Sequence, residues 1–323
     1  MFSYGISGSG KTFTLFGPDG LDDPEAWFKW REPRKLWGIF PRLVYSLFEM
    51  CEKTWGFSMK YFQNVVDKIR DLMSPTGEER SYKGMKNDDD GFMDISWCIA
   101  AVLKSWDRFS DTFTKAHRRK AVAPTQFNRI STRGHCILNL VFEKPRDDGF
   151  GNEVDGFGNV KRQKGRIYVC DLAGAEPAGD IFYAAYSKVE HSDGTSEYKL
   201  MGPHKDQKLT KNLQLQSKKI NLSLSEMSQY FTKLAQMVKT NRLKAGKKMP
   251  GCNSYFLCKY LKGVIRQGHT YMFCAIRPEA TYLNYTSSSL SFATRVFDAQ
   301  KKKKVSKFCA SECDVLGVKG LAE

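Results

Sequence analysis

The sequence contains no run of 18 consecutive apolar residues, which predicts that the chain has no transmembrane helix. It shows no signal peptide, because residues 2–10 lack a basic segment and a long apolar stretch. Its nine cysteines never occur with the C-x-x-C spacing of zinc sites. The pair Cys309 and Cys313 has no histidine nearby, which disfavours a metal site. Free thiols in a reducing compartment are the simpler interpretation.

The chain does have the material for a core and an excess of positive charge. Of its 323 residues, 41% are hydrophobic and 13% are aromatic, enough for one large domain or two small ones. The formal net charge is +16. Such an excess favours a polyanionic partner: nucleic acid, an anionic membrane or an acidic protein surface. Charge alone does not choose among these partners.

Residues 5–12 read Gly-Ile-Ser-Gly-Ser-Gly-Lys-Thr and match the phosphate-binding pattern G-x-x-x-x-G-K-[ST]. In this pattern the glycines let backbone N–H groups turn toward nucleotide phosphates. Lys11 reaches the β- and γ-phosphates, and the Thr12 hydroxyl holds Mg²⁺. The nucleotide contacts expected in this segment are Gly5, Ser7, Gly8, Ser9, Gly10, Lys11 and Thr12. A Gly-Ser turn without a ligand is the competing interpretation.

Apolar periodicity and turn residues predict that strands and helices alternate along the chain. Strands are expected over residues 57–66, 136–142, 166–170 and 270–276, helices over residues 39–50, 102–120, 220–238, 256–265 and 288–300, and loops over residues 16–37, 147–165 and 239–248. Residues 177–211 form a polar stretch with no clear period. The apolar stripe over residues 220–238 indicates a core helix, with a groove for a partner helix as the alternative. These elements predict an α/β fold with a mixed central sheet flanked by helices on both faces.

Asp171 supplies a second half of the expected nucleotide site. It follows the apolar run of residues 166–170, and Gly174 lies shortly after it. In nucleotide hydrolases such a carboxylate lies behind the water shell of Mg²⁺, and the glycine N–H can meet the γ-phosphate and so sense its presence. A strand-end cap is the alternative for an isolated aspartate. Together with residues 5–12, Asp171 favours a Mg-ATP site.

Segments along most of the chain resemble the kinesin motor domain. They are residues 2–12 (family pattern F-x-Y-G-x-T-G-S-G-K-T), 38–42 (G-I-I-P-R), 61–72 (Y-x-E-I-Y-N-E-x-I-x-D-L), 128–135 (N-x-x-S-S-R-S-H), 171–176 (D-L-A-G-S-E), 220–224 (I-N-x-S-L) and 290–293 (L-x-F-A). They occur in the family's order. The resemblance implies a P-loop NTPase motor domain over residues 1–297, followed by a basic and flexible neck or tail over residues 298–323.

The resemblance also implies roles for matched residues. Ser131 and Thr132 would offer hydroxyls to Mg²⁺, the γ-phosphate and the attacking water. Arg133 and Glu176 would form an ion pair that closes the two switch segments over ATP, with a purely structural ion pair as the alternative. The Mg²⁺ contacts implied are Thr12 and Thr132, with Asp171 acting through water. His135 is expected to pack behind the site, since phosphoryl transfer depends mainly on positioning and charge stabilisation.

The family further implies a microtubule partner and a place in the cytoplasm on the cytoskeleton. Its docking surface corresponds here to the helix over residues 220–238 and the adjoining basic loop. That loop carries Lys239, Arg242, Lys244, Lys247 and Lys248. Such a loop would steer the chain toward acidic tubulin, and binding should weaken with salt. A solvated basic loop is the alternative.

The sequence departs from the family pattern in three respects. The family's first strands and its adenine-contacting R-x-R-P are missing before residue 1, so a truncated motor, with the middle strand of its sheet lost, is expected. Residues 251–257 replace Y-R-D-S-K-L-T, and Tyr255 stands where the family has a filament-binding lysine. Gly134 and Ala175 replace serines, each removing a hydroxyl near the γ-phosphate.

Three functions are compatible with the sequence. The first is an ATP-driven microtubule motor, supported by the phosphate loop and both switch segments. The second is a relic that binds nucleotide or filament without moving, suggested by Tyr255 and the missing strands. The third, a nucleic-acid-binding ATPase, is disfavoured because no element interleaves basic and aromatic residues.

Overall fold

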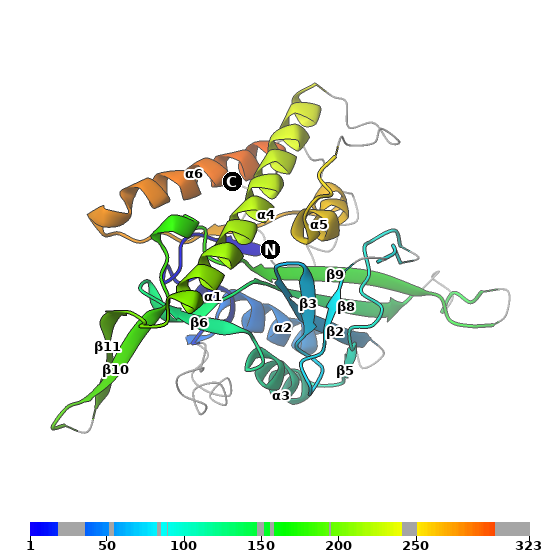
Figure 1. Ribbon diagram of the computed structural model, residues 1–323. Coiled ribbons are helices and arrows are strands. Elements are labelled where there is room, and N and C mark those ends of the chain that lie inside the picture. Colours follow the sequence, from blue (N-terminus) through cyan, green and yellow to red (C-terminus); the bar gives the residue numbers. More distant parts are fainter. Residues whose placement is uncertain are drawn as a thin grey trace.

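The computed structural model describes residues 1–18, 36–51, 55–82, 85–88, 90–146, 152–155, 158–193, 195–240 and 251–300. An eight-stranded mixed sheet runs through its centre in the order β12-β1-β9-β8-β2-β3-β4, with β5 also paired to β2 (Figure 1). Its strands are β1 (Phe2–Tyr4), β2 (Gly56–Val65), β3 (Lys68–Asp71), β4 (Glu79–Ser81), β5 (Ala101–Leu103), β8 (His135–Pro145), β9 (Arg162–Asp171) and β12 (Met272–Cys274). The expected mixed sheet is confirmed.

The short strand β1 occupies a central position in this sheet. It pairs in parallel with β12 on one side and with β9 on the other. The rings of Phe2 and Tyr4 pack against Phe292, and Phe2 also stacks on Phe231. The expectation that the sheet loses its middle strand is therefore wrong, because three residues suffice when both neighbours supply hydrogen bonds and two helices cover the side chains. Within the described residues, β12 pairs with β1 alone.

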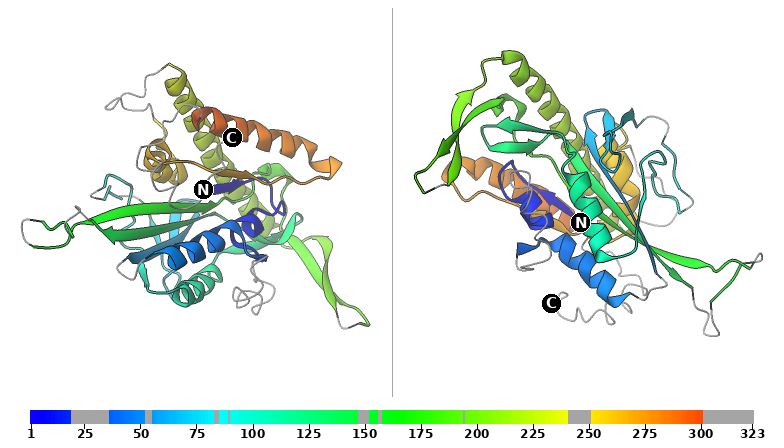
Figure 2. Two further views of the ribbon diagram at one scale, coloured as in Figure 1. Left: turned by 180° about the vertical axis from the view of Figure 1, so that it is seen from behind. Right: turned by 90° about the horizontal axis from the view of Figure 1, so that it is seen from below.

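Helices cover both faces of the sheet (Figures 1 and 2). On one face lie α1 (Lys11–Phe16), α2 (Ile39–Met50) and α3 (Trp106–His117), whose apolar residues form one core with β2 and β8. On the other lie α4 (Gln207–Lys239), α5 (Phe256–Gln267) and α6 (Leu283–Gln300), which form a second core with β1 and β9. The prediction that helices flank both faces of the sheet is confirmed. The carboxyl end of β1 borders a cavity.

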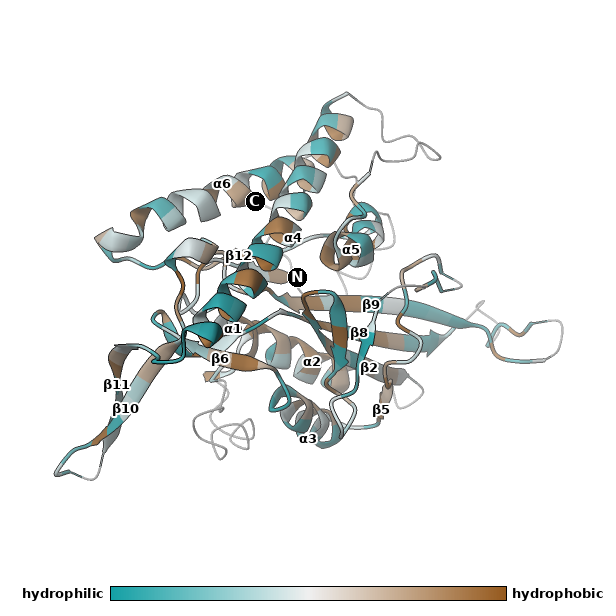
Figure 3. Ribbon diagram, viewed as in Figure 1, coloured by the Kyte–Doolittle hydropathy of each residue, from teal (hydrophilic) through white to brown (hydrophobic). Residues whose placement is uncertain are grey.

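The helix α4 is 33 residues long and begins well before the predicted stripe. All six predicted stripe positions are buried: Ile220, Leu224, Met227, Phe231, Leu234 and Val238. Asp206 precedes the helix and accepts a hydrogen bond from the Lys208 N–H, as an N-cap does. Figure 3 shows hydrophilic and hydrophobic residues alternating along α4. The burial of the six apolar positions confirms the core interpretation.

Three other expectations need correction. Residues 177–211, which show no period, contain an antiparallel hairpin of β10 (Ala184–Glu190) and β11 (Ser196–Pro203) that projects from the body (Figure 1). Most of its side chains are exposed, so no apolar alternation marked it. The helix expected from residue 102 begins at Trp106, because Ala101–Leu103 pair with β2 and Ser105 caps α3. The strand β9 extends back to Arg162, into the expected loop.

The last helix, α6, continues past residue 297 to Gln300, with Ala299 buried. The remaining residues of the expected neck or tail, 301–323, lie outside the described part, as does most of the expected loop over residues 16–37. None of the described helices combines the length and hydropathy of a membrane-spanning segment. The described cysteines are free thiols.

Candidate functional site

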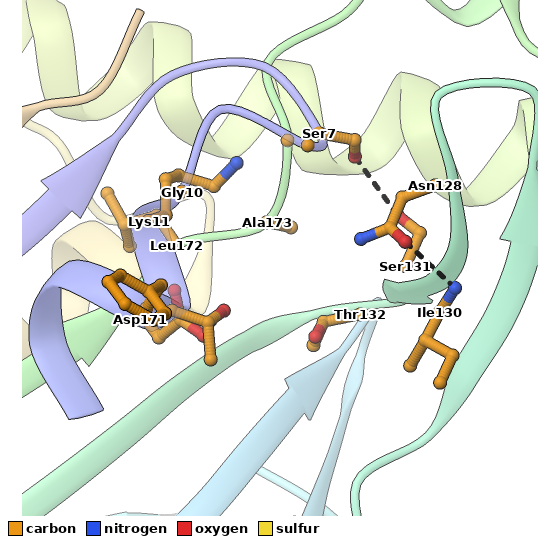
Figure 4. A pocket seen from close by; sticks show the side chains of 14 residues that line it. Ser7, Gly10, Lys11, Asn128, Ile130, Ser131, Thr132, Asp171, Leu172 and Ala173 are labelled. Carbon is orange, nitrogen blue, oxygen red and sulfur yellow. Dashed lines mark hydrogen bonds between the residues drawn. The ribbon is translucent and has the colours of Figure 1, made fainter. Parts of the chain in front are cut away.

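A cavity of about 240 Å³ opens where three segments meet: the loop between β1 and α1, the strand β7 (Asn128–Thr132) and the residues after β9. β7 pairs with β6 (Val122–Thr125) outside the main sheet. Nine of the predicted site residues line the cavity (Figure 4): Ser7, Gly8, Gly10, Lys11, Thr12, Ser131, Thr132, Asp171 and Gly174. The structure thus brings together residues far apart in sequence, as the motifs predicted.

Four predicted residues support the cavity from behind. Gly5 accepts a hydrogen bond from the Ala175 N–H at 3.3 Å, and Ser9 Oγ donates to the Ile6 carbonyl at 2.8 Å. The side chains of Arg133 and Glu176 are buried beside the cavity.

The loop before α1 requires glycine at specific positions. Gly5 has φ 149°, and a Cβ there would lie 2.0 Å from the Ala275 carbonyl oxygen. Gly8 and Gly10 have φ 76° and 89°, a region that side chains disfavour. No atom lies within 4 Å of a Cβ built on Gly10, so this part of the loop borders open space. The backbone is therefore a concave cradle into which a phosphate could fit.

Lys11 places a buried ammonium group at this cradle. The residue is only 8% exposed, and its Nζ donates to the Ile6 carbonyl at 2.7 Å. Among the described residues, Nζ has no second acceptor at hydrogen-bonding distance. Burial lowers the Lys11 pKa, while the carboxylates of Glu176 and Asp171 act in the opposite direction. An ammonium with unused donors at a cavity fits an anionic ligand.

Thr12 and Asp171 meet in the wall of the same cavity. Thr12 Oγ1 donates to Asp171 Oδ2 at 2.7 Å, and Ser3 Oγ donates to Oδ1 at 3.3 Å. Asp171 ends β9 next to β1, which brings the carboxylate to the loop. A hydroxyl and a carboxylate are oxygen donors of the kind that Mg²⁺ prefers. The residues present therefore fit the Mg²⁺ site that the sequence predicts.

A hydrogen-bond network links the loop to both switch segments. Glu176 Oε1 accepts from Ser7 Oγ at 2.6 Å, and Oε2 accepts from the Ser7 N–H at 3.0 Å. Ser7 Oγ also lies 3.0 Å from Ser131 Oγ (Figure 4). Arg133 donates to the Ser131 carbonyl at 3.2 Å and to its hydroxyl.

The predicted ion pair between Arg133 and Glu176 is not among the contacts of the described residues: Glu176 accepts from Ser7, and Arg133 donates to Ser131. The two groups still interact at longer range. Burial lowers the Arg133 pKa, and the Glu176 charge raises it.

Comparison with known proteins gives the family. The model of the kinesin motor domain matches residues 1–189, more than half of the chain. The chain belongs to the kinesin motor domain family. It is 26% identical over 234 residues to a kinesin heavy chain of Syncephalastrum racemosum, covering 66% of this chain and 22% of that protein. It is 28% identical over 184 residues to the kinesin-like protein KIF19 of Mus musculus, covering 55% and 16%. The chain thus matches about a fifth of these relatives' length.

Solved kinesin structures share its fold. KIF14 with AMP-PNP in complex with a microtubule aligns with a TM-score of 0.65 at 20% identity, over 91% of this chain and 70% of that one. KIF14 with ADP in complex with a microtubule gives a TM-score of 0.62 at 22% identity, over 95% and 74%. The P-loop NTPase fold of kinesin motors is thereby confirmed.

Neither glycine of the kinesin switch motifs leaves room for a side chain in this structure. A Cβ on Gly134 would lie 2.2 Å from the Asn64 carbonyl oxygen, so the family's serine would clash in this structure. A Cβ on Gly174 would lie 2.2 Å from Glu176 Oε2. Gly174 lines the cavity, and its lack of a side chain lets Glu176 approach closely.

His135 packs behind the kinesin site and does not line the cavity. Its Nδ1 accepts from the Ala173 N–H at 3.3 Å, and its Nε2 lies 2.8 Å from Ser223 Oγ on α4. Burial lowers the pKa of His135 to about 3, so the ring is neutral at pH 7. It connects the segment after β9 to α4.

Sequence reasoning missed several lining residues. Phe13 lines the cavity and is 55% exposed, although it directly follows the phosphate loop. Asn128 and Ile130 line it from β7, where Asn128 Oδ1 accepts from the Ile130 N–H at 3.1 Å (Figure 4). The signal available in the sequence was the position of Phe13, an aromatic residue directly after the phosphate loop.

The expected filament-binding residues are only partly described. Lys239 is the last residue of α4 and is exposed. Arg242, Lys244, Lys247 and Lys248 lie outside the described residues. Tyr255, at the position of a family lysine, is the N-cap residue of α5, and its N–H donates to Glu226 Oε2 at 2.9 Å.

Proposed function

We propose that the chain binds Mg-ATP in this cavity and hydrolyses it, and that turnover is coupled to microtubule binding and movement. The observation that carries the proposal is the meeting of Lys11, the Thr12–Asp171 pair and Ser131 around one glycine-rich cavity. Membership of the kinesin family supports the same reaction. The proposed nucleotide ligands are the residues predicted from sequence, with Phe13 offering its exposed ring to the base.

The chain's own groups would divide the work of phosphoryl transfer. Lys11 would move its unused donors onto phosphate oxygens, and the backbone N–H groups near Gly8 and Gly10 would complete the cradle. Thr12, Thr132 and, through water, Asp171 would hold Mg²⁺, which when bound neutralises charge on the phosphates. The Ser131 and Thr132 hydroxyls would orient the attacking water, a positioning role.

Release of Glu176 from Ser7 is the change we propose for closure. Glu176 is held by two hydrogen bonds from Ser7, and Arg133 by Ser131, so both partners of the predicted ion pair are engaged locally. A phosphate that displaces Ser7 and Ser131 from each other would free Glu176 to meet Arg133. Gly174 would then contribute its N–H to the same phosphate.

The helix α4 offers a connection from this switch to a filament. Asn221 on α4 donates to the Glu176 carbonyl at 2.8 Å, and the same helix ends at Lys239, where the basic loop begins. The solved KIF14 structures are complexes with microtubules. A net charge of +16 and the lysines of residues 239–248 suit an acidic filament surface.

ATP turnover with and without microtubules tests the proposal. Turnover is expected to rise with microtubules and to fall by about 100-fold or more in Glu176→Ala, as for loss of a group that acts in the transition state. Lys115→Ala, which removes an exposed charge on α3, is the matched control and should behave as the wild type. Folded chain without microtubule-stimulated turnover would contradict the motor proposal.

A second candidate is a protein that binds filaments without moving. Tyr255 favours it, since this uncharged residue stands at the N-cap of α5, where the family has lysine. Pelleting with microtubules that weakens with salt but is the same with ATP, ADP or no nucleotide would favour this function over a motor.

A further inference from the structure

The hairpin of β6 and β7 carries Ser131 and Thr132 to the cavity but lies outside the main sheet. Its base is fixed to β2, because Gln63 donates to the Ala121 carbonyl at 3.0 Å and accepts from the Ala121 N–H at 2.7 Å. A two-stranded hairpin alone is marginally stable in water. The position of β7 therefore depends on what holds the other end of this hairpin.

The tip of the β6–β7 hairpin is bound to the segment that leads into β10. Gln126 Oε1 accepts from the Phe182 N–H at 3.1 Å, and Gln126 Nε2 donates to the Asp180 carbonyl. The backbone of Thr125 pairs with that of Tyr183 in an isolated antiparallel bridge. These contacts tie the hairpin that holds the first switch segment to residues that follow the second.

The β10–β11 hairpin lies beside β6 (Figure 1), and two of its tyrosines complete the attachment. Tyr186 on β10 donates from its hydroxyl to the last carbonyl of β6 at 2.6 Å. The Arg129 guanidinium lies over the ring of Tyr198 on β11, 3.9 Å from its centre, where cation and ring attract each other. Arg129 stands in β7 between Asn128 and Ile130, which line the cavity. Because successive side chains of a strand point to opposite faces, Arg129 points away from the cavity and toward the β10–β11 hairpin.

The foot of the β10–β11 hairpin is anchored to the first half of α4. The Tyr183 N–H donates to Thr210 Oγ1 at 3.1 Å, and Gln214 Nε2 donates to the Ile181 carbonyl at 3.0 Å. Ile181 and Ala184 are buried at this foot. Since the hairpin is fixed at its foot, a side chain that projects from it can hold β7 in place.

We propose that the β10–β11 hairpin is a brace that positions the Ser131 and Thr132 hydroxyls for ATP hydrolysis, with Tyr198, Arg129 and Tyr186 as positioning residues. The inference rests on the proposed function, which assigns those hydroxyls to Mg²⁺ and the attacking water. None of the three positioning residues is among the described residues that line the cavity. They act by restricting β7, because reacting groups displaced by about 1 Å can lose about 100-fold in rate.

Single-turnover ATP cleavage and Mg-ADP affinity of Tyr198→Ala test the positioning role. Tyr198 is 48% exposed, so its removal should leave the chain folded. The rate of cleavage should fall about tenfold, whereas the Kd for Mg-ADP should stay within about twofold, because the phosphate loop is untouched. Tyr198→Phe keeps the ring under Arg129 and should restore the rate. Lys199→Ala, at the next and exposed position of β11, is the matched control and should behave as the wild type.

A second variant removes only the hydroxyl that reaches β6. Tyr186→Phe should slow single-turnover cleavage by about threefold, the scale of one neutral hydrogen bond. A rate equal to that of the wild type in both Tyr198→Ala and Tyr186→Phe would overturn the positioning role.

Hydrogen exchange of the nucleotide-free chain separates this inference from the proposed function. The amides of residues 122–132 should exchange about tenfold faster in Tyr198→Ala than in the wild type, and at the wild-type rate in Tyr198→Phe. Equal exchange in Tyr198→Ala and the wild type would overturn the brace. A wild-type chain that cleaves no ATP would instead overturn the proposed function, and the exchange rates would still decide whether the hairpin holds β7.

Discussion

The two halves of α4 adjoin regions that differ in how closely they follow the kinesin pattern. Beside the first half, Asn221 and Ser223 contact Glu176 and His135, which belong to retained motifs. Beside the second half, Glu226 and Lys233 hold residues 251–255, where the family pattern is replaced. Residues of the cavity hold one another in a closed network, so each replacement there would affect several partners. Glu226 and Lys233 bond to backbone groups of residues 251–255, so the side chains of that segment can diverge separately.

The largest difference between the two regions should appear on removing the Thr12 hydroxyl. Thr12 Oγ1 contacts Asp171 at 2.7 Å at the proposed Mg²⁺ position. Thr12→Ala is expected to lower ATP turnover by about 100-fold, the usual cost of one group that stabilises the transition state. Steady-state turnover over a Mg²⁺ titration measures this. The control is Thr14→Ala in the same helix, α1, which removes a hydroxyl that donates to the Gly10 carbonyl. Its turnover should stay close to that of the wild type.

The pH dependence of stability should show that His135, buried behind the proposed nucleotide cavity, is neutral in the folded chain. The pKa of His135 is about 3 when folded, below its ordinary value near 6.5, so the unfolded chain binds more protons between these values. Stability is then fully present above about pH 6.5 and falls as pH drops, by up to about 1.4 kcal/mol per pH unit for this group. Burial and Lys120 lower the His117 pKa in the same direction.

Replacing His135 separates the two histidines. His135→Asn should reduce the slope of unfolding free energy against pH by up to one proton, measured by urea unfolding from pH 7 to pH 5. The His117 contribution should remain. An unchanged slope in His135→Asn would show that His135 is not held neutral by the fold.

Replacing Glu226, which holds the segment before α5 to α4, should lower the stability of the chain more than its ATP turnover. Glu226 on α4 accepts from the backbone N–H groups of Ser254 and Tyr255, just before α5 begins. Glu226→Gln loses the charge and one strong acceptor, so the free energy of unfolding should fall by about 1 kcal/mol. Urea unfolding measures this against Glu190→Gln on the exposed hairpin, which should be neutral. Equal stability of the two variants would contradict the role of Glu226 in holding this segment to α4.

The smallest expected effect is on microtubule affinity, when Tyr255 is changed back to the lysine of the family pattern. Tyr255→Lys restores the family's charge at the start of α5. Microtubule affinity should rise about threefold at low salt, the scale of one exposed ion pair, and the gain should vanish at high salt. Co-sedimentation measures this. Val102→Lys, an exposed position on β5, adds the same charge elsewhere and should not change affinity.

Much of the nucleotide region could be predicted from sequence, because its chemistry depends on residue types at fixed spacing. Gly5 to Thr12, Asp171 and Ser131 were placed together by motifs, and the buried stripe of α4 by its period. The Ser7–Glu176 bonds were not predictable, since they depend on how two loops approach. The β10–β11 hairpin was not predicted because its exposed residues carry no apolar alternation.

Calorimetric titration of the folded chain with Mg-ATP and Mg-ADP tests the central claim most directly. The account predicts saturable binding at one site, and at least about tenfold weaker binding to Lys11→Ala, because a charge-assisted hydrogen bond to phosphate is lost. No binding heat from a folded wild-type chain, or equal binding by wild type and Lys11→Ala, would contradict it.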